Sequence, residues 1–164
     1  ADAARMTKKD LQRWVEKANG GSLPGATVPW VAAGSPFGHE LALEWIDSTH
    51  PLVASAGWAR LSSEASIKND ADLDLLEWNR LLQRVQKTIR NEPDAVRSAM
   101  NHFIIAVGCY VESLTTLALE LGEKLGPITA NLGDNNCQIP FAPDYIRKVQ
   151  ARGGIGKKRK SAKC

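Results

Sequence analysis

The chain has 164 residues, of which 43% are hydrophobic and 24% are charged, and this fits a single domain with one sizeable core. Its longest stretch without Lys, Arg, Asp or Glu, residues 18–39, is interrupted by asparagine, glycine and proline, which excludes a membrane-spanning helix. Three cysteines without CxxC spacing fit a reducing compartment better than a disulfide framework and predict a cytoplasmic protein.

The net charge of +3 hides an uneven distribution along the chain. Residues 147–164 contain eight Lys or Arg and no acid, whereas residues 1–146 contain 13 basic and 18 acidic side chains. Gly153 and Gly154 precede the most basic part. We therefore predict a folded, acidic domain over residues 1–152 and a basic, disordered tail over residues 153–164.

Capping residues and apolar spacing predict three helices in the first part of the chain, and no useful run alternates with the period of a strand. Thr7 is the N-cap of a helix over residues 8–19, which two glycines end. A shorter helix within residues 23–33 begins at one of its two prolines. Ser35-Pro36 then predicts the start of a third helix.

The rest of the chain predicts longer helices. Pro51 opens a helix that runs to about residue 67, and residues 75–89 form a strongly amphipathic helix with apolar side chains three and four positions apart. Pro93 opens its partner. Two further helices are expected over residues 112–124 and 142–152, separated by a loop rich in Asn, Gly and Pro.

A short internal repeat indicates how these helices are organised. Val53-Ala54-Ser55-Ala56 recurs as Val96-Arg97-Ser98-Ala99, 43 positions later, and each set follows shortly after a proline. A period of about 40 to 47 residues built from two helices is typical of HEAT and armadillo arrays. We predict an all-α, HEAT/armadillo-like superhelix of antiparallel helix pairs.

The five tryptophans divide into two groups. Trp14, Trp45 and Trp78 lie on apolar stripes and are expected in the core. Trp30 and Trp58 lie near small residues, where an exposed indole could stack on a base or a sugar, and core packing is the alternative.

Two stretches carry a resemblance to a known family. Residues 91–101, continued by 104–108, are similar to the hallmark segment of the bacterial DNA alkylation repair enzyme family, and so are residues 136–140 followed by 143–146. The similarity extends from Met6 to the end. It implies a HEAT-like superhelix that corresponds to the central and C-terminal repeats of the family, without its N-terminal helices, and that binds DNA along its concave face.

In the glycosylases of that family, the resemblance implies excision of alkylated bases by a carboxylate, indoles and an arginine. Here residues 18–39 contain no Asp or Glu, and residues 18–59 contain no Lys or Arg. Asn101 or His102 occupies the place of an indole. These departures argue against base excision by that mechanism and leave enzymatic activity uncertain, because no carboxylate matches the one that would stabilise a cationic sugar.

Basic side chains supply the remaining candidates for nucleic-acid contact. Arg84 and Lys87 belong to a row on the helix over 75–89 that could follow a phosphate backbone or form a solvated face. Arg97 and Asn101, four residues apart, could contact a phosphate or brace the neighbouring repeat. The tail run consists of Lys157, Lys158, Arg159 and Lys160. This run predicts non-specific, salt-dependent DNA binding, with a solubilising tail or a nuclear-targeting signal as alternatives.

No metal site or cofactor is predicted, since His39, His50 and His102 lie on different segments without metal-binding spacing. Two functions remain open. One is a monomeric DNA-binding protein that recognises damaged or distorted duplex without sequence specificity. The other is a HEAT scaffold for a protein partner, without nucleic-acid or enzymatic activity.

Overall fold

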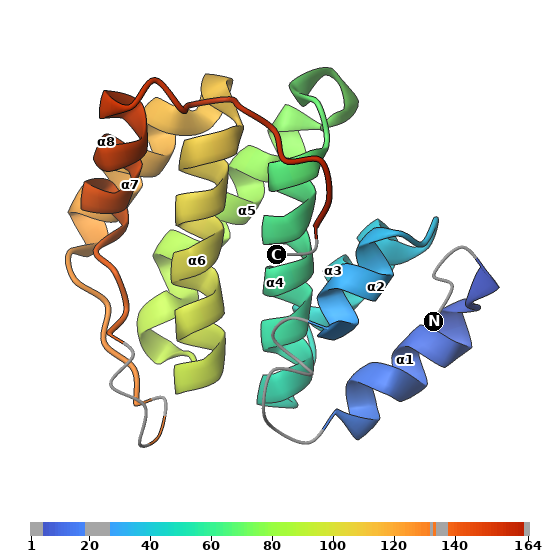
Figure 1. The fold of residues 1–164 in the computed structure, drawn as a ribbon. Coiled ribbons are helices and arrows are strands. Elements are labelled where there is room, and N and C mark those ends of the chain that lie inside the picture. The colour runs from blue at the N-terminus through green and yellow to red at the C-terminus, as the bar shows by residue number, and fades with distance from the viewer. Residues whose placement is uncertain (1–4, 19–26, 132, 134–137, 163–164) are drawn as a thin grey trace.

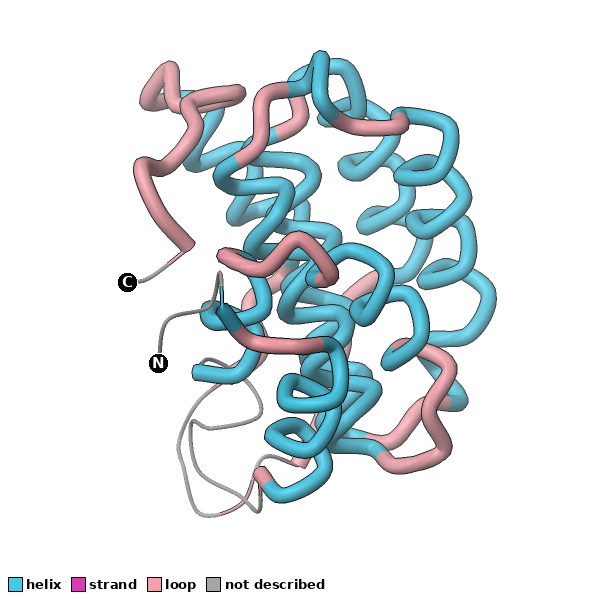
Figure 2. The backbone as a smooth tube through the Cα atoms, turned by 90° about the vertical axis from the view of Figure 1, so that its right-hand side faces the viewer, coloured by secondary structure: helices cyan, strands magenta, loops and turns pink. Residues whose placement is uncertain are grey.

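The structure, a computed structural model, describes residues 5–18, 27–131, 133 and 138–162 (Figure 1). Within these residues the chain forms eight α-helices and three short 3₁₀ helices, without a strand (Figure 2). The α-helices are α1 (Lys8–Lys17), α2 (Val28–Ala33), α3 (Gly38–Trp45), α4 (Pro51–Ile67), α5 (Leu75–Thr88), α6 (Asp94–Tyr110), α7 (Thr115–Leu125) and α8 (Ala142–Ala151). The 3₁₀ helices are η3 (Asp70–Asp72), η4 (Ile89–Asn91) and η5 (Glu112–Leu114). The prediction of an all-α protein is confirmed.

The helices form two layers. α4, α6 and α8 lie side by side in the inner layer, with α4 and α6 packed along their length, and α5 and α7 lie behind them in the outer layer (Figure 1). α2 and α3 both pack against α4. The helices are thus arranged in pairs, in which an outer helix is followed in the chain by an inner helix, as in a HEAT-like repeat.

The 43-residue repeat matches the start of the two long inner helices. His50 is the N-cap of α4 and Pro93 is the N-cap of α6, at the same spacing as the repeated tetrapeptides. Ser55 and Ser98 therefore occupy equivalent positions one turn into each helix. The sequence repeat therefore shows how the two neighbouring inner helices, α4 and α6, are aligned with each other.

Aromatic side chains fill the space between the layers. Phe103 on α6 contacts Trp58 on α4, with ring centroids 5.1 Å apart, and Trp78 on α5, at 5.5 Å. Gly57 permits the close approach of α3, because a Cβ atom there would lie 2.9 Å from the carbonyl oxygen of Ala42. The aromatic core therefore connects the three consecutive helices α4, α5 and α6.

Three local predictions need correction. Trp14 is 39% exposed, because Leu11 and Val15 form the buried face of α1, whereas Trp45 and Trp78 are buried as expected. The third helix begins at Gly38, since Ser35 Oγ accepts the Phe37 N–H within a preceding turn. The segment expected to open the helix over 112–124 is the 3₁₀ helix η5.

Candidate nucleic-acid interface

A groove of about 760 Å³ runs over the inner layer. Its walls come from α4, α6 and α8, and residues 153–162 cross one end of it (Figure 1). We call these ten residues the strap. The side chains that line this inner groove are Trp30, Leu52, Ser55, Ala59, Ser62, Ser63, Ser66, Ala95, Ser98, Ala99, His102, Ile105, Ala106, Cys109, Tyr110, Tyr145, Val149, Gly154, Lys157, Arg159 and Ala162.

Small side chains line the α4 wall of the groove, so this wall projects little into the groove and carries no charge. The hydroxyl of Ser62 donates to the carbonyl oxygen of Trp58 at 2.9 Å, and that of Ser63 donates to Ala59 at 3.0 Å. Hydroxyls bonded back to their own helix keep a lone pair free to accept from a ligand, but they add no charge. A bulky partner can therefore approach the backbone of α4 closely.

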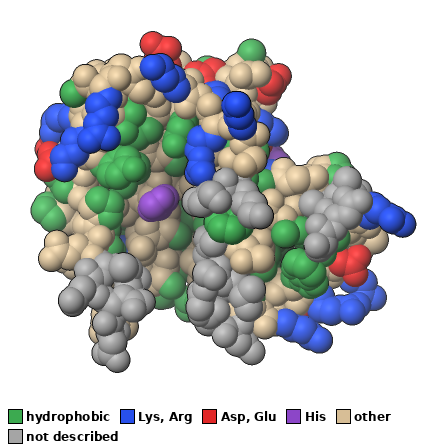
Figure 3. Space-filling view, in the orientation of Figure 1, with side chains coloured by type: hydrophobic (Ala, Val, Ile, Leu, Met, Phe, Trp, Pro, Cys, Tyr) green, Lys and Arg blue, Asp and Glu red, His purple; other side chains and the backbone are tan. Residues whose placement is uncertain are grey.

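The groove contains no acid among its described lining residues, although the chain as a whole has 18 Asp and Glu. Lys157 and Arg159 contribute positive charge. Space-filling shows hydrophobic side chains in the hollow, with Lys and Arg side chains around its upper part (Figure 3). This distribution favours a negatively charged ligand, since no lining carboxylate would repel it.

The strap holds its place by capping two inner helices. Gly156 N–H donates to the carbonyl oxygen of Cys109 near the end of α6, and Arg159 N–H donates to that of Ser66 near the end of α4. Lys158 Nζ lies 3.0 Å from the oxygen of Ala65 and 2.8 Å from Asp70 Oδ1. These bonds satisfy carbonyls that lack helical partners, and they place a cation at the negative end of α4.

The sequence predicted a disordered tail, whereas the structure places residues 153–162 against the ends of α6 and α4. The side chains of residues 157–159 alternate in direction: Lys157 and Arg159 line the groove, while Lys158 is turned toward the body. Lys160 is exposed. Within the basic run, Lys158 thus has a structural role, while Lys157 and Arg159 face the groove.

The basic row on the helix over 75–89 lies away from the groove. Arg80 and Lys87 are exposed on α5, in the outer layer behind α4 and α6 (Figure 1). Arg84 is held in place, because its guanidinium donates to Asp47 at 2.7 Å and to the carbonyl oxygen of Ile46 at 2.9 Å. The expectation that Arg84 and Lys87 follow a phosphate backbone together with the other candidates is not supported by this placement.

The two candidate indoles separate. Trp30 is half-buried and lines the groove. Trp58 is fully buried, with Arg84 5.8 Å from its ring centroid, so the prediction that it could stack on a base is wrong and the core alternative is confirmed. The small residues that flank Trp58 in the sequence reflect a close contact between helices. From the sequence alone, such a contact cannot be distinguished from an exposed indole.

Arg97 and Asn101 brace the loop that leads to α8. Arg97 donates to the carbonyl oxygens of Thr129 at 2.8 Å and Glu92 at 3.0 Å. Asn101 is buried and donates to the carbonyl oxygen of Pro140 at 2.9 Å. Both residues make the backbone contacts that the bracing alternative expects, and these bonds satisfy loop carbonyls that no helix supplies with donors.

Comparison with other proteins agrees with this arrangement. No protein-family model matches the sequence. Uncharacterized proteins of Listeria innocua and Listeria monocytogenes are 35% identical over 111 residues, which cover 68% of this chain and 46% of each of theirs. A solved structure from a new family of proteins, related to the HEAT-like repeat DNA glycosylases and with affinity for branched DNA structures, matches at a TM-score of 0.92 and 27% identity.

The chain is similar in fold to this member of a family related to the HEAT-like repeat DNA glycosylases. The structural match covers all of this chain and 70% of the solved one, and it confirms both the family resemblance and the HEAT-like fold. The chain spans about half the length of the Listeria relatives it matches, at 46%.

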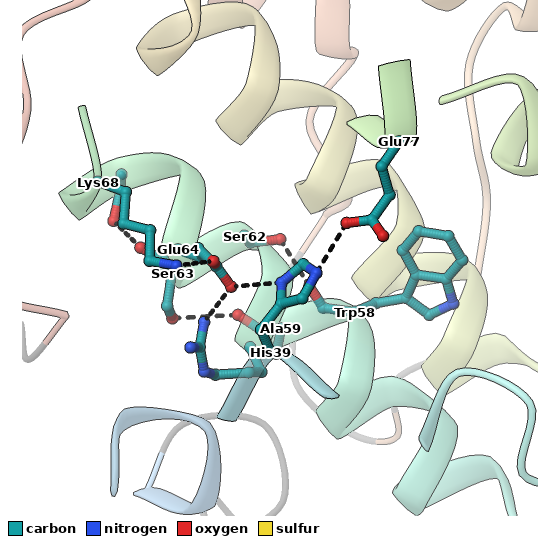
Figure 4. Close-up of polar contacts among 10 residues, drawn as sticks. His39, Trp58, Ala59, Ser62, Ser63, Glu64, Lys68 and Glu77 are labelled. Carbon is teal, nitrogen blue, oxygen red and sulfur yellow. Dashed lines mark hydrogen bonds and ion pairs between the residues drawn. The ribbon is translucent and has the colours of Figure 1, made fainter. Parts of the chain in front are cut away.

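This HEAT-like protein also contains a buried charged cluster that the sequence did not indicate. Glu64 on α4 accepts from Arg60 at 2.8 Å and from Lys68 at 2.6 Å, both on the same helix. His39 on α3 lies between Glu64, at 3.1 Å from Nδ1, and Glu77 on α5, at 2.7 Å from Nε2 (Figure 4). The spacing of four residues between Arg60, Glu64 and Lys68 was the available signal.

The geometry sets the protonation of this cluster. Because both ring nitrogens of His39 face carboxylates, the imidazole must be doubly protonated to donate to each. Burial alone raises the pKa of Glu64, but the hydrogen bond from His39, the charge of Arg60 and the contact with Lys68 lower it to about 2. The cluster ties three helices together and contributes nothing to the lining of the groove.

The part of the chain that the structure describes lacks both a metal-binding cluster and a single helix that could span a membrane. No group of three or more His, Cys, Asp or Glu side chains is placed there to hold a metal ion. No single described helix is long and apolar enough to span a membrane, and Asp94–Tyr110 with Glu112–Leu125 would reach that length and composition only as a pair bent by 117°.

Proposed function

We propose that this HEAT-like protein binds the phosphate backbone of distorted or branched duplex DNA along its inner groove, without excising a base. One observation carries the proposal: the described lining of the groove has no acid, and the strap fixes Lys157 and Arg159 at its edge. A polyanion favours a surface that is basic and free of carboxylates, and backbone contacts of this kind are independent of sequence.

The neutral wall of α4 supports the same proposal. Serine and alanine side chains allow the sugar-phosphate backbone to approach the helix, and serine hydroxyls commonly contact phosphate oxygens. Trp30, half-buried in the lining, offers a flat surface for a sugar or a base. The affinity of the related structure's family for branched DNA points to the same class of ligand.

Base excision is not part of the proposal. Excision through a cationic sugar needs a carboxylate beside the reacting base, and the described lining of the groove supplies none. The alternative of a protein scaffold gains from the outward placement of the α5 row. The groove without acidic side chains favours DNA over a protein partner. A duplex supplies regularly spaced negative charge, and an acidic protein would have to match that spacing.

Matched charge variants test the proposal. Lys157→Gln with Arg159→Gln removes one Lys and one Arg from the groove, and Arg80→Gln with Lys87→Gln removes the same charges from the outer layer. Binding to labelled duplex DNA is measured by fluorescence anisotropy over a salt series. Each phosphate contact contributes about 0.9 to the slope of log K against log salt, so the groove pair should flatten it by about 1.8.

The control pair should leave the slope unchanged. Equal flattening by both pairs would show that only overall charge matters, and absence of DNA binding by the unaltered protein would leave the scaffold alternative. Base release from alkylated duplex, measured under single-turnover conditions, is expected from neither the protein nor its variants; release would refute the proposal of binding without excision.

A further inference from the structure

A second basic surface lies on α8, beside the groove and separate from the strap. Tyr145, Lys148 and Arg152 are three and four residues apart, so they share one face of the helix. Tyr145 is 47% exposed, and it lines the groove together with Val149. The face therefore continues the α8 wall of the groove outward to solvent, and we call these three residues the α8 stripe.

The charges of the stripe are not neutralised by the described residues. Among these residues, no carboxylate lies within ion-pair distance of Lys148 or Arg152, both of which are exposed. The neighbouring Arg147 is instead paired with Glu123 at 2.5 Å and with Asp144 at 3.7 Å. Lys148 and Arg152 thus extend the exposed surface of α8 beyond this paired arginine as two cations without an ion-pair partner among the described residues.

The stripe and the strap diverge from a common corner. α8 ends at Ala151, and the chain turns at Gly153, whose φ of +64° suits glycine, before the strap crosses the ends of α6 and α4 (Figure 1). One basic track follows the axis of α8 and the other runs across it. Figure 3 shows Lys and Arg side chains on both sides of the hydrophobic hollow.

We propose that the α8 stripe is a second phosphate-binding track, which receives a second arm of DNA at a branch point while the first arm lies against the strap. This inference rests on the proposed function. The two strands of a linear duplex keep a fixed separation, whereas strands at a branch leave in different directions and can follow two diverging tracks. Tyr145 stands at the edge between groove and stripe, where a base unstacked at the branch can stack on its ring.

The test compares a four-way DNA junction with a linear duplex that has the sequence of one arm. The unaltered protein should prefer the junction. Lys148→Gln with Arg152→Gln, again one Lys and one Arg, should weaken junction binding about tenfold, as expected for two lost phosphate contacts, and change duplex binding less than about twofold. The Arg80→Gln with Lys87→Gln pair is the control, and thermal unfolding verifies that each variant is folded.

The possible results separate the two proposals. Equal weakening of junction and duplex by the α8 pair would overturn the second track, because the stripe would then belong to a single binding surface. No change on either DNA would overturn it too, and if Lys157→Gln with Arg159→Gln still weakens both DNAs, the proposed function stands. If that groove pair has no effect on either DNA, the proposed function fails as well.

Discussion

The Arg60–Glu64 pair is where a change of one functional group should destabilise this protein most. Its side chains are 3% and 2% exposed, and their closest nitrogen and oxygen atoms are 2.8 Å apart. Glu64→Gln keeps the shape of the side chain but removes the charge that compensates a buried guanidinium. Arg60 Nε has no hydrogen-bond partner among the residues that the structure describes, so little else there compensates the cation.

The size of the effect follows from the burial of the pair. Removing one partner of a buried ion pair destabilises a protein by about 3–5 kcal/mol, and each kcal/mol shifts the unfolding midpoint of a domain of this size by about 2–4 °C. We expect Glu64→Gln to lower the midpoint by about 10 °C. Glu77→Gln removes a carboxylate that is 28% exposed and contacts only His39 in this cluster, so it should cost below about 1 kcal/mol.

Urea denaturation of both variants measures the difference in free energy of unfolding, provided that the dependence on urea concentration keeps its slope. Adding Arg60→Met to Glu64→Gln should recover most of the loss, because the uncompensated cation is then absent. A loss in Glu64→Gln no larger than in Glu77→Gln would refute the reasoning, and so would a double variant less stable than Glu64→Gln alone.

Two further predictions concern pH and the strap. The hydrogen bond to Glu64 raises the pKa of His39 above 6.5, although burial opposes this shift. The stabilisation of the protein relative to the His39→Asn variant should therefore be greatest below pH 6.5. It should decline as the pH rises through the raised pKa. Urea denaturation at several pH values measures this; a pH-independent difference contradicts it. Lys158→Met, which loses the contacts with Ala65 and Asp70, should speed hydrogen exchange of the Arg159 amide and weaken duplex binding; unchanged exchange would separate Lys158 from strap order.

The helical architecture was accessible from sequence because the signals were local. Pro51 and Pro93 mark helix starts by chemistry that does not depend on the rest of the fold, and the structure has α4 and α6 begin there. Apolar spacing located α5 in the same way. The repeat of 43 residues then fixed which helices are equivalent.

The interface was less accessible, because helical periodicity identifies a face and not the layer that the face belongs to. The row that contains Arg84 and Lys87 is real, but α5 is an outer helix, so the row faces away from the groove. Conversely, the spacing of Tyr145, Lys148 and Arg152 was present in the sequence. Its meaning depends on α8 flanking the groove, which only the packed structure establishes.

The strap illustrates a different limit. Its composition, rich in Lys and Gly, is typical of disordered segments, because it offers few apolar side chains to bury. Its order comes instead from backbone N–H groups of Gly156 and Arg159 that meet the carbonyls of two helix ends. Such bonds depend on where the helices stop in space, and no side-chain pattern encodes that position.

The strap also has a consequence for the order of folding. Its bond from Lys158 to Ala65 joins positions 93 residues apart, which makes it one of the most non-local contacts in the molecule. A contact of this range forms only after the intervening segments have condensed, since closing so long a loop in a disordered chain is slow and entropically unfavourable. The edge of the groove is therefore completed late, after α4, α6 and α8 have docked, and a partly folded chain lacks the surface on which DNA would bind.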